Sequence, residues 1–247
     1  MQLTISGQRR KYLQLMLGAG ARAFAVCSGF GEIDGQPVEE AALRELQATL
    51  LRRSRGARFK YQLALPKAMA GLLISVLSRL NAYLYQRSAG HEDYVTSGAS
   101  LTLVLLCGER AYLAHAGTTA AYLVRSGYVV ALTKDDSCAF DAAGAQRILT
   151  RGLGIGSQMQ LSVCSFRVMS NDTLVLASKR LAGFADRRAL AAWILGGETT
   201  GAFGDHTVAA IPIWFPQVAA AAPPARHARL WYVTVAILLS ILLLLAA

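Results

Sequence analysis

Short apolar runs separated by glycine-containing turns dominate the sequence, and this pattern restricts the chain to a fold built around β-sheets. In these runs the apolar residues alternate with polar ones or form short continuous blocks, as expected of strands. The predicted strands are Arg22–Cys27, Ser100–Cys107, Ala111–Ala116, Ala120–Arg125, Tyr128–Thr133, Gln160–Val168, Thr173–Ala177 and Thr207–Ile213. Ser126-Gly127 joins two of them and predicts a β-hairpin.

Two longer segments have helical spacing instead. Pro37–Arg55 begins with acidic residues and ends with basic ones, which suits the helix dipole. Pro66–Ser88 has a stripe of leucines typical of a helix that packs on a core. A shorter helix is predicted over Asp186–Leu195. The predicted order is one strand, two helices, many strands, a short helix and a last strand. This is an α+β pattern in which helices cover sheets.

The C-terminus predicts a membrane anchor. Residues 230–247 form an uncharged apolar run of about 18 residues, roughly 27 Å as a helix, which is near the minimum for a bilayer core. Trp231 and Tyr232 suit the interface, and Arg226 and Arg229 place the preceding side in the cytoplasm. We therefore expect a main domain over 1–216, an Ala-, Pro- and Arg-rich linker over 217–229, and a single transmembrane helix over 230–247.

The N-terminus and the cysteines indicate a reducing compartment. The first residues lack the apolar core of a signal peptide, so the main domain is expected to remain in the cytoplasm. The four cysteines, Cys27, Cys107, Cys138 and Cys164, lack CxxC spacing and lie mostly in apolar runs. This favours reduced, buried thiols over disulfides or a zinc site.

The charge balance limits the chemistry that the chain can support. The formal net charge is +10, with only 15 Asp and Glu residues. A basic patch is concentrated at Arg52, Arg53, Arg55, Arg58 and Lys60. Such a patch is either a solvated helix end or a surface for anionic lipid or nucleic acid.

Several segments, taken in order, resemble the successive motifs of the PPM family, the metal-dependent type 2C Ser/Thr phosphatases. Phe24–Gly31 resembles the strand that ends in Ala-Asp-Gly-Met-Gly-Gly. Ala111–Leu123 resembles a strand, the Gly-Asp-Ser-Arg turn and the next strand. The remaining matches are Gly98–Ser100 with Gly-Thr-Thr, Leu132–Ser137 with Leu-Thr-Arg-Asp-His-Ser, Leu149–Gly154 with Thr-Arg-Ala-Leu-Gly, Asp172–Arg180 with the strand ending in Ser-Asp-Gly, and Gly204–Val208 with Asp-Asn-x-Thr.

This resemblance implies a two-sheet β-sandwich flanked by helices, with two Mg²⁺ or Mn²⁺ ions held by aspartates between the sheets. Carried over position by position, the metal-site aspartates fall on Gln14, Ser28, Thr118, Lys179 and Gly204. None of these is a carboxylate, although hard divalent cations require anionic oxygen ligands. We therefore expect no metal cofactor and no catalytic residues. The segment between Ser137 and Leu149 is short for the family, so a flap beside the site is expected to be reduced.

Some features of the family site remain. Gly29 stands where the family uses a backbone carbonyl, and Arg9 or Arg10 resembles its phosphate-binding arginine. Together with Lys179, these arginines predict a site for an anion. Other carboxylates that could build a different metal site are Glu32, Asp34, Asp136 and Asp205.

The sequence therefore predicts a membrane-anchored, catalytically inactive phosphatase homologue with a regulatory or scaffolding role, which binds a protein or phosphorylated partner. One alternative is an active metal-dependent Ser/Thr phosphatase with a rearranged metal site, in which Mg²⁺ or Mn²⁺ would be the cofactor. Another is a basic module that binds nucleic acid or anionic lipid near the membrane, nucleic acid being the less expected ligand.

Overall fold

The computed structural model describes residues 4–6, 11–56, 59, 65–88, 97–139, 147–180 and 207–215. Contacts divide the chain into two units, Met1–Trp214 and Phe215–Ala247. All of the elements below belong to the first unit. The short helix predicted over 186–195, the linker over 217–229 and the membrane helix over 230–247 lie outside the described residues.

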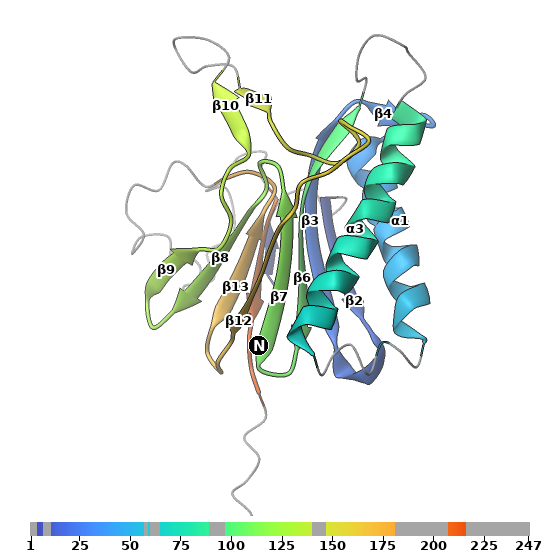
Figure 1. Cartoon of the computed structure of the whole chain (residues 1–247). Helices are drawn as coiled ribbons and strands as arrows, with labels where there is room; N and C mark the ends of the chain where they lie inside the picture. Colours follow the sequence, from blue (N-terminus) through green and yellow to red (C-terminus); the bar gives the residue numbers. More distant parts are fainter. Residues whose placement is uncertain are drawn as a thin grey trace, which may run out of the picture. The chain divides into compact units, whose positions relative to one another are not determined.

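Two five-stranded antiparallel sheets form a sandwich (Figure 1). One sheet has the order β12-β7-β6-β3-β2 and the other β1-β14-β13-β8-β9. The first comprises β2 (Tyr12–Met16), β3 (Arg22–Phe30), β6 (Gly98–Cys107), β7 (Arg110–Ala116) and β12 (Ser162–Arg167). The second comprises β1 (Thr4–Ser6), β8 (Ala120–Arg125), β9 (Tyr128–Ala131), β13 (Thr173–Ala177) and β14 (Val208–Pro212).

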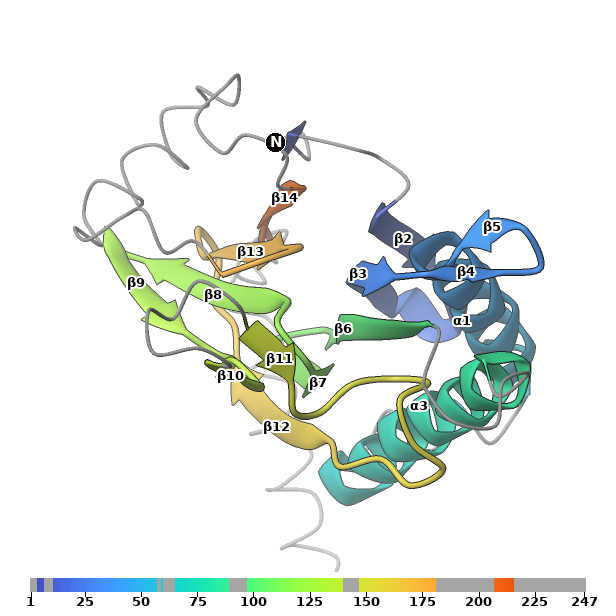
Figure 2. The same cartoon turned by 90° about the horizontal axis from the view of Figure 1, so that it is seen from above.

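Helices α1 (Val38–Ser54) and α3 (Pro66–Ser88) cover the outer face of the first sheet, as the view from above shows (Figure 2). Two small hairpins, β4 (Glu32–Ile33) with β5 (Gln36–Pro37) and β10 (Ser137–Ala139) with β11 (Arg147–Leu149), complete the fold. A single 3-10 turn, η2 (Gly18–Gly20), connects β2 to β3. The α+β sandwich with flanking helices is confirmed.

The main core lies between the helices and the first sheet. The leucine stripe of α3 is buried against β-strand residues such as Ala25, Leu101 and Leu103. Each fully buried leucine contributes about 2 kcal/mol of transfer free energy. β6 is buried along almost its whole length because the helices cover one face and the second sheet covers the other.

Among the described residues, one helix is long and apolar enough to cross a membrane, and it is α3. Its apolar residues Leu73, Leu77 and Leu80 are at most 1% exposed within the domain core. The apolar character of α3 is therefore accounted for by its packing on the first sheet.

Candidate functional site

Polar residues meet at the end of the sandwich where β3 finishes and β6 begins. Ser28 lies opposite Ser100 in the register of these two strands. The Ser100 Oγ accepts a hydrogen bond of 3.0 Å from the Thr118 backbone N–H and lies 3.2 Å from the Thr118 Oγ1. The buried Ser100 therefore has Ser28 beside it on β3 and is bonded to Thr118 in the turn that leads to the second sheet.

The tight β7–β8 turn that brings Thr118 to this position depends on Gly117. Its φ of +106° disfavours L side chains, and a Cβ there would lie 2.2 Å from the Ser100 Oγ. The glycine thus allows the turn to approach β6 closely.

Lys179 reaches the same end from the second sheet. Ala177, the last residue of β13, pairs with Ala120, the first residue of β8, so Lys179 follows β13 at the same end of the sheet where Thr118 precedes β8. The neighbouring Ser178 donates its backbone N–H to the Thr207 carbonyl over 2.8 Å, and its Oγ accepts the Thr207 N–H over 3.0 Å. Lys179 itself is exposed to solvent.

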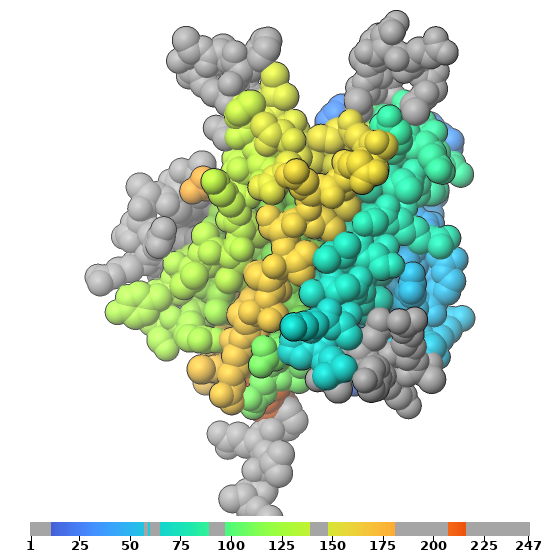
Figure 3. Space-filling view, in the orientation of Figure 1, coloured from blue at the N-terminus to red at the C-terminus, as the bar shows by residue number. Residues whose placement is uncertain are grey.

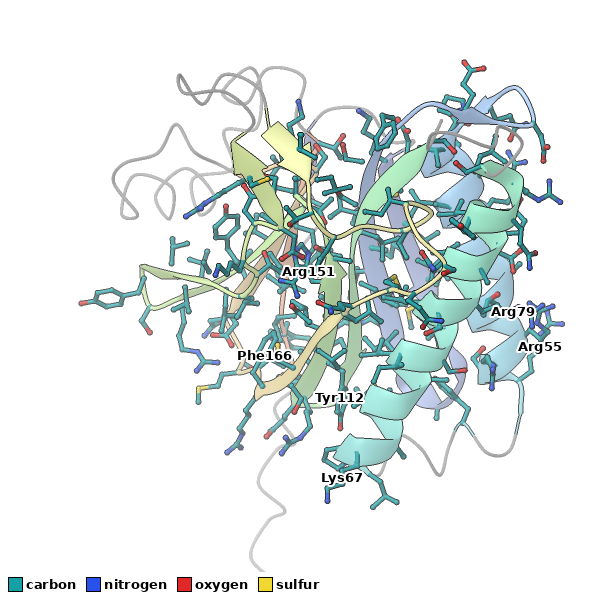
Figure 4. The ribbon with its side chains drawn as sticks, turned by 45° about the horizontal axis from the view of Figure 1, so that its top comes forward. Arg55, Lys67, Arg79, Tyr112, Arg151 and Phe166 are labelled. Atoms are coloured by element: carbon teal, nitrogen blue, oxygen red, sulfur yellow. The ribbon has the colours of Figure 1, made fainter. Side chains whose placement is uncertain are left out.

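A buried carboxylate, Asp136, lies beside these residues and is fully engaged. Its Oδ2 accepts the Gly117 N–H over 3.1 Å, and its Oδ1 forms an ion pair with Arg151. Its main-chain carbonyl also accepts two hydrogen bonds from Thr150, at 2.7 and 2.8 Å. Asp136 was predicted only as a spare carboxylate, and its pairing with Arg151, near the centre of Figure 4, was not foreseen.

Behind Asp136, a buried hydrogen-bonded chain passes through His115. The His115 Nε2 is 2.9 Å from the Lys134 carbonyl, which can only accept, so Nε2 carries the proton. Nδ1 therefore accepts from the Thr102 hydroxyl over 2.9 Å, and Thr102 in turn accepts from Thr119 over 2.8 Å. Burial lowers the pKa of His115 below its ordinary value, although the nearby Asp136 opposes this effect.

We name this group of residues the polar end of the sandwich. It comprises Ser28, Ser100, Thr118, Asp136, Arg151 and Lys179. Its hydroxyls are neutral, its carboxylate is already paired, and it has two cationic side chains. Within the part of the chain that the structure describes, no group of three or more His, Cys, Asp or Glu residues is placed to hold a metal ion. This chemistry suits an anion better than a divalent cation.

The other predicted site residues are distributed differently. Gln14 pairs with Phe24 in β3. Phe24 precedes Ser28 by four residues, which separates Gln14 from Ser28 by roughly 13 Å along the strand direction. The structure therefore does not bring Gln14 to the polar end. Gly29 is beside Ser28, and a Cβ there would lie 2.2 Å from the Val38 Cγ1, so close packing on α1 requires glycine. Arg9, Arg10 and Gly204 lie outside the described residues.

The spare carboxylates are also separated. Glu32 and Asp34 lie on the β4–β5 hairpin, where Asp34 forms an ion pair with Arg87 of α3. Asp205 lies outside the described residues.

The basic patch is only partly described. Arg52, Arg53 and Arg55 are exposed at the end of α1, whereas Arg58 and Lys60 lie outside the described residues.

The cysteine prediction is half right. All four thiols are free, and burial raises the pKa of Cys107 to about 11. Cys27 is buried, but Cys138 and Cys164 are exposed rather than buried, because both lie on outer hairpin or edge strands.

Comparison with solved structures identifies the fold. The chain is similar to the S. agalactiae serine/threonine phosphatase, with a TM-score of 0.64 and 18% identity over 85% of this chain and 98% of that one. It is also similar to PppA of Pseudomonas aeruginosa, described as a key regulatory component of T6SS, with a TM-score of 0.61 and 20% identity over 86% and 97% of the two chains. No protein-family model matches the sequence, and no curated protein matches it significantly.

A third similar structure is the catalytic domain of the phosphatase PstP in complex with two manganese ions, with a TM-score of 0.60 and 19% identity over 85% and 96% of the two chains. The chain thus has the fold of the type 2C Ser/Thr phosphatases, and the resemblance seen in the sequence motifs is confirmed at that level.

The prediction that no metal cofactor belongs to this chain is contradicted by this comparison, because the PstP domain of the same fold holds two manganese ions. The prediction rested on a residue-by-residue transfer of ligands, and the register places one of those residues, Gln14, away from the others. The described residues of the polar end alone do not fit two manganese ions, since their one carboxylate is paired with Arg151. Any further ligand has to come from outside them.

Proposed function

We propose that this chain is a catalytically inactive protein with the type 2C phosphatase fold, which binds a phosphorylated or acidic segment of a protein partner at its polar end. The observation that carries this proposal is the convergence of Ser28, Thr118 and Lys179 on one end of the sandwich. In the family resemblance these positions carry aspartates. Here they carry two hydroxyls and an ammonium group.

The charge of the polar end supports an anionic ligand. Replacing one aspartate with Lys179 changes the local charge by two units in the positive direction. Arg151 adds a second cation, one third exposed, whose charge Asp136 balances. An ammonium and neighbouring hydroxyl and backbone N–H donors are the groups that bind phosphate oxygens in proteins. Arg9 and Arg10, by their sequence position, are proposed to join Lys179 in this role.

Binding to a phosphorylated peptide tests the proposal. The full-length chain in detergent is titrated with a phosphoserine peptide and with its unphosphorylated form, by calorimetry. We expect selective binding of the phosphorylated peptide that Lys179→Ala weakens about tenfold, the loss of one charge-assisted contact. Arg180→Ala is the matched control, because Arg180 is the adjacent exposed cation. Equal affinity for both peptides, or equal losses in both variants, contradicts the proposal.

A second candidate function is an active, manganese-dependent Ser/Thr phosphatase with a rearranged metal site. The similarity to the manganese-bound catalytic domain of PstP favours it. Asp205, one residue from the position of the last family aspartate, is the residue through which such a site would be built. Metal-dependent turnover distinguishes the two candidates.

We also propose that residues 230–247 anchor the chain in a membrane with the main domain in the cytoplasm. Support comes from the uncharged apolar run and the preceding arginines. A reporter fused to residues 217–247 is expected in the membrane fraction. Recovery of the full-length chain in the soluble fraction without detergent contradicts the anchor.

We further propose a regulatory role for the chain. Its similarity to PppA, which is described as a regulatory component of its own system, agrees with this role.

A further inference from the structure

We propose that the outer surface of helices α1 and α3 docks onto an anionic lipid bilayer. This inference is independent of phosphate binding at the polar end. The surface, called the helical face below, comprises Arg52 and Arg53 of α1, Arg55 directly after it, and Lys67, Ile74, Ser75 and Arg79 of α3.

The contacts between the helices hold three arginines of the helical face together. The Arg53 guanidinium donates to the Ser75 Oγ over 3.2 Å, so the end of α1 lies against the first half of α3. Arg52 and Arg79 each approach the Glu45 carboxylate, at 3.9 and 3.8 Å. Arg79 is far from Arg52 and Arg53 in the sequence, so the sequence cluster at 52–60 describes only part of the basic surface.

The charge of the helical face is not balanced by its own acidic residues. Glu45, near the middle of α1, is the last acidic residue of that helix, and α3 contains no Asp or Glu at all. This one carboxylate lies near both Arg52 and Arg79, which keep more than half of their side chains exposed, at 58% and 57%. Arg53 donates instead to the neutral Ser75 hydroxyl. A surplus of cations on one face attracts an anionic surface, at about fivefold in affinity for each residue near a lipid headgroup.

The shape and the apolar content of the face favour a bilayer over a nucleic acid. The helices lie side by side along one side of the molecule, and the space-filling view shows α3 as a broad ridge (Figure 3). Arg55 and Arg79 project outward from the two helices, and Lys67 marks the beginning of α3 (Figure 4). Ile74 is 46% exposed on α3 and lies two turns after Lys67, on the same side of that helix. An exposed aliphatic side chain on a cationic helix face can enter the headgroup region, whereas single-stranded nucleic acid is bound through aromatic stacking.

A photo-crosslinking experiment tests this inference on the full-length chain. A benzophenone amino acid replaces Ile74, and the chain is reconstituted with vesicles of phosphatidylcholine alone or with about one third phosphatidylserine. The control carries the same probe at Tyr128, which is 67% exposed on β9 of the other sheet. Crosslinking to lipid is measured by mass shift, at low and high salt.

We expect crosslinking from position 74 that is about tenfold higher with phosphatidylserine and is reduced by high salt. The triple variant Arg52→Gln, Arg53→Gln and Arg79→Gln is expected to reduce it to the level of the Tyr128 control. Equal crosslinking in both kinds of vesicle, or from both positions, overturns the inference. Loss of lipid crosslinking when a short RNA is added also overturns the inference, because RNA is then the better ligand of the helical face. Circular dichroism confirms that the triple variant is folded.

Discussion

At the scale of single residues, the most constrained group is the buried chain of hydrogen bonds from Thr119 through Thr102 and His115 to the Lys134 carbonyl. His115 is entirely buried and its hydrogen bonds fix one neutral tautomer. Both nitrogens are already used, so a second proton on Nδ1 would displace the bond from Thr102. Protonation would therefore leave the Nε2–H bond to the Lys134 carbonyl in place and remove the bond that joins β7 to Thr102 of β6.

We predict that this histidine makes the domain less stable in mild acid. Its pKa is lowered in the folded state, so the unfolded chain binds a proton more readily. The free energy of unfolding should be constant above about pH 7 and fall as the pH drops below the unfolded-state pKa of about 6.5. Denaturant titrations between pH 7.5 and 5.5 measure this slope. His115→Gln, which cannot titrate, should flatten it, and an equal slope in the variant would contradict the assignment.

Removing the partner of Asp136 should also be costly. Arg151→Ala leaves a buried carboxylate without its cation, and we expect a loss of about 2 kcal/mol, below the full value for a buried pair because Arg151 is partly exposed. Arg167→Ala is the control, since Arg167 and Glu109 form a pair that is more than half exposed. The Arg167–Glu109 pair should contribute less than about 1 kcal/mol to the free energy of unfolding. Similar losses in the two variants, measured by chemical denaturation, would argue against a structural role for Arg151.

At the scale of elements, the segment after β11 shows how a motif that looks functional becomes structural. The glycines at 152, 154 and 156 superficially resemble a nucleotide-binding loop. In the structure the buried Asn81 of α3 accepts the Gly154 N–H over 2.8 Å and donates to the Gly156 carbonyl over 2.9 Å. Gly154 has a φ of +80°, and a Cβ there would lie 3.0 Å from the Leu84 Cβ. These glycines let the loop pack on α3 and next to β6.

We predict that Asn81→Ala destabilises the domain by about 1–3 kcal/mol, because it leaves the Gly154 and Gly156 groups without their partner. Thermal or urea unfolding measures this loss. Gln86→Ala, on the exposed side of the same helix, should change the stability by less than about 0.5 kcal/mol. An Asn81→Ala variant as stable as the control would show that water replaces the side chain.

The elements differ in how well the sequence predicts them. The bounds predicted for β8 and β13 are those observed, because both strands are apolar on two faces and have clear turns at their ends. The hairpin β10–β11 and the strand β2 were not predicted. β10 and β11 have only three residues each. β2 did carry a usable signal, since Leu13 and Leu15 pack on the core while Gln14 and Met16 are exposed.

At the scale of the whole molecule, the fold could be predicted from the order of its motifs, but the site only in part. Ser28, Thr118 and Lys179 end or follow strong strands, so their convergence could be expected from the resemblance. Gln14 was placed by spacing alone, and the register of β2 with β3 moves it away. The Asp136–Arg151 pair depends on the path of two loops, which no local pattern encodes.

The most direct test of the central claim, catalytic inactivity in a phosphatase fold, is a turnover measurement. The full-length chain in detergent is assayed for hydrolysis of p-nitrophenyl phosphate and of a phosphoserine peptide, with millimolar Mn²⁺ supplied because the similar PstP domain binds manganese. We predict a rate equal to the protein-free background and unchanged in Asp205→Asn. Manganese-dependent hydrolysis that Asp205→Asn abolishes would contradict the account and establish the rearranged, active site in its place.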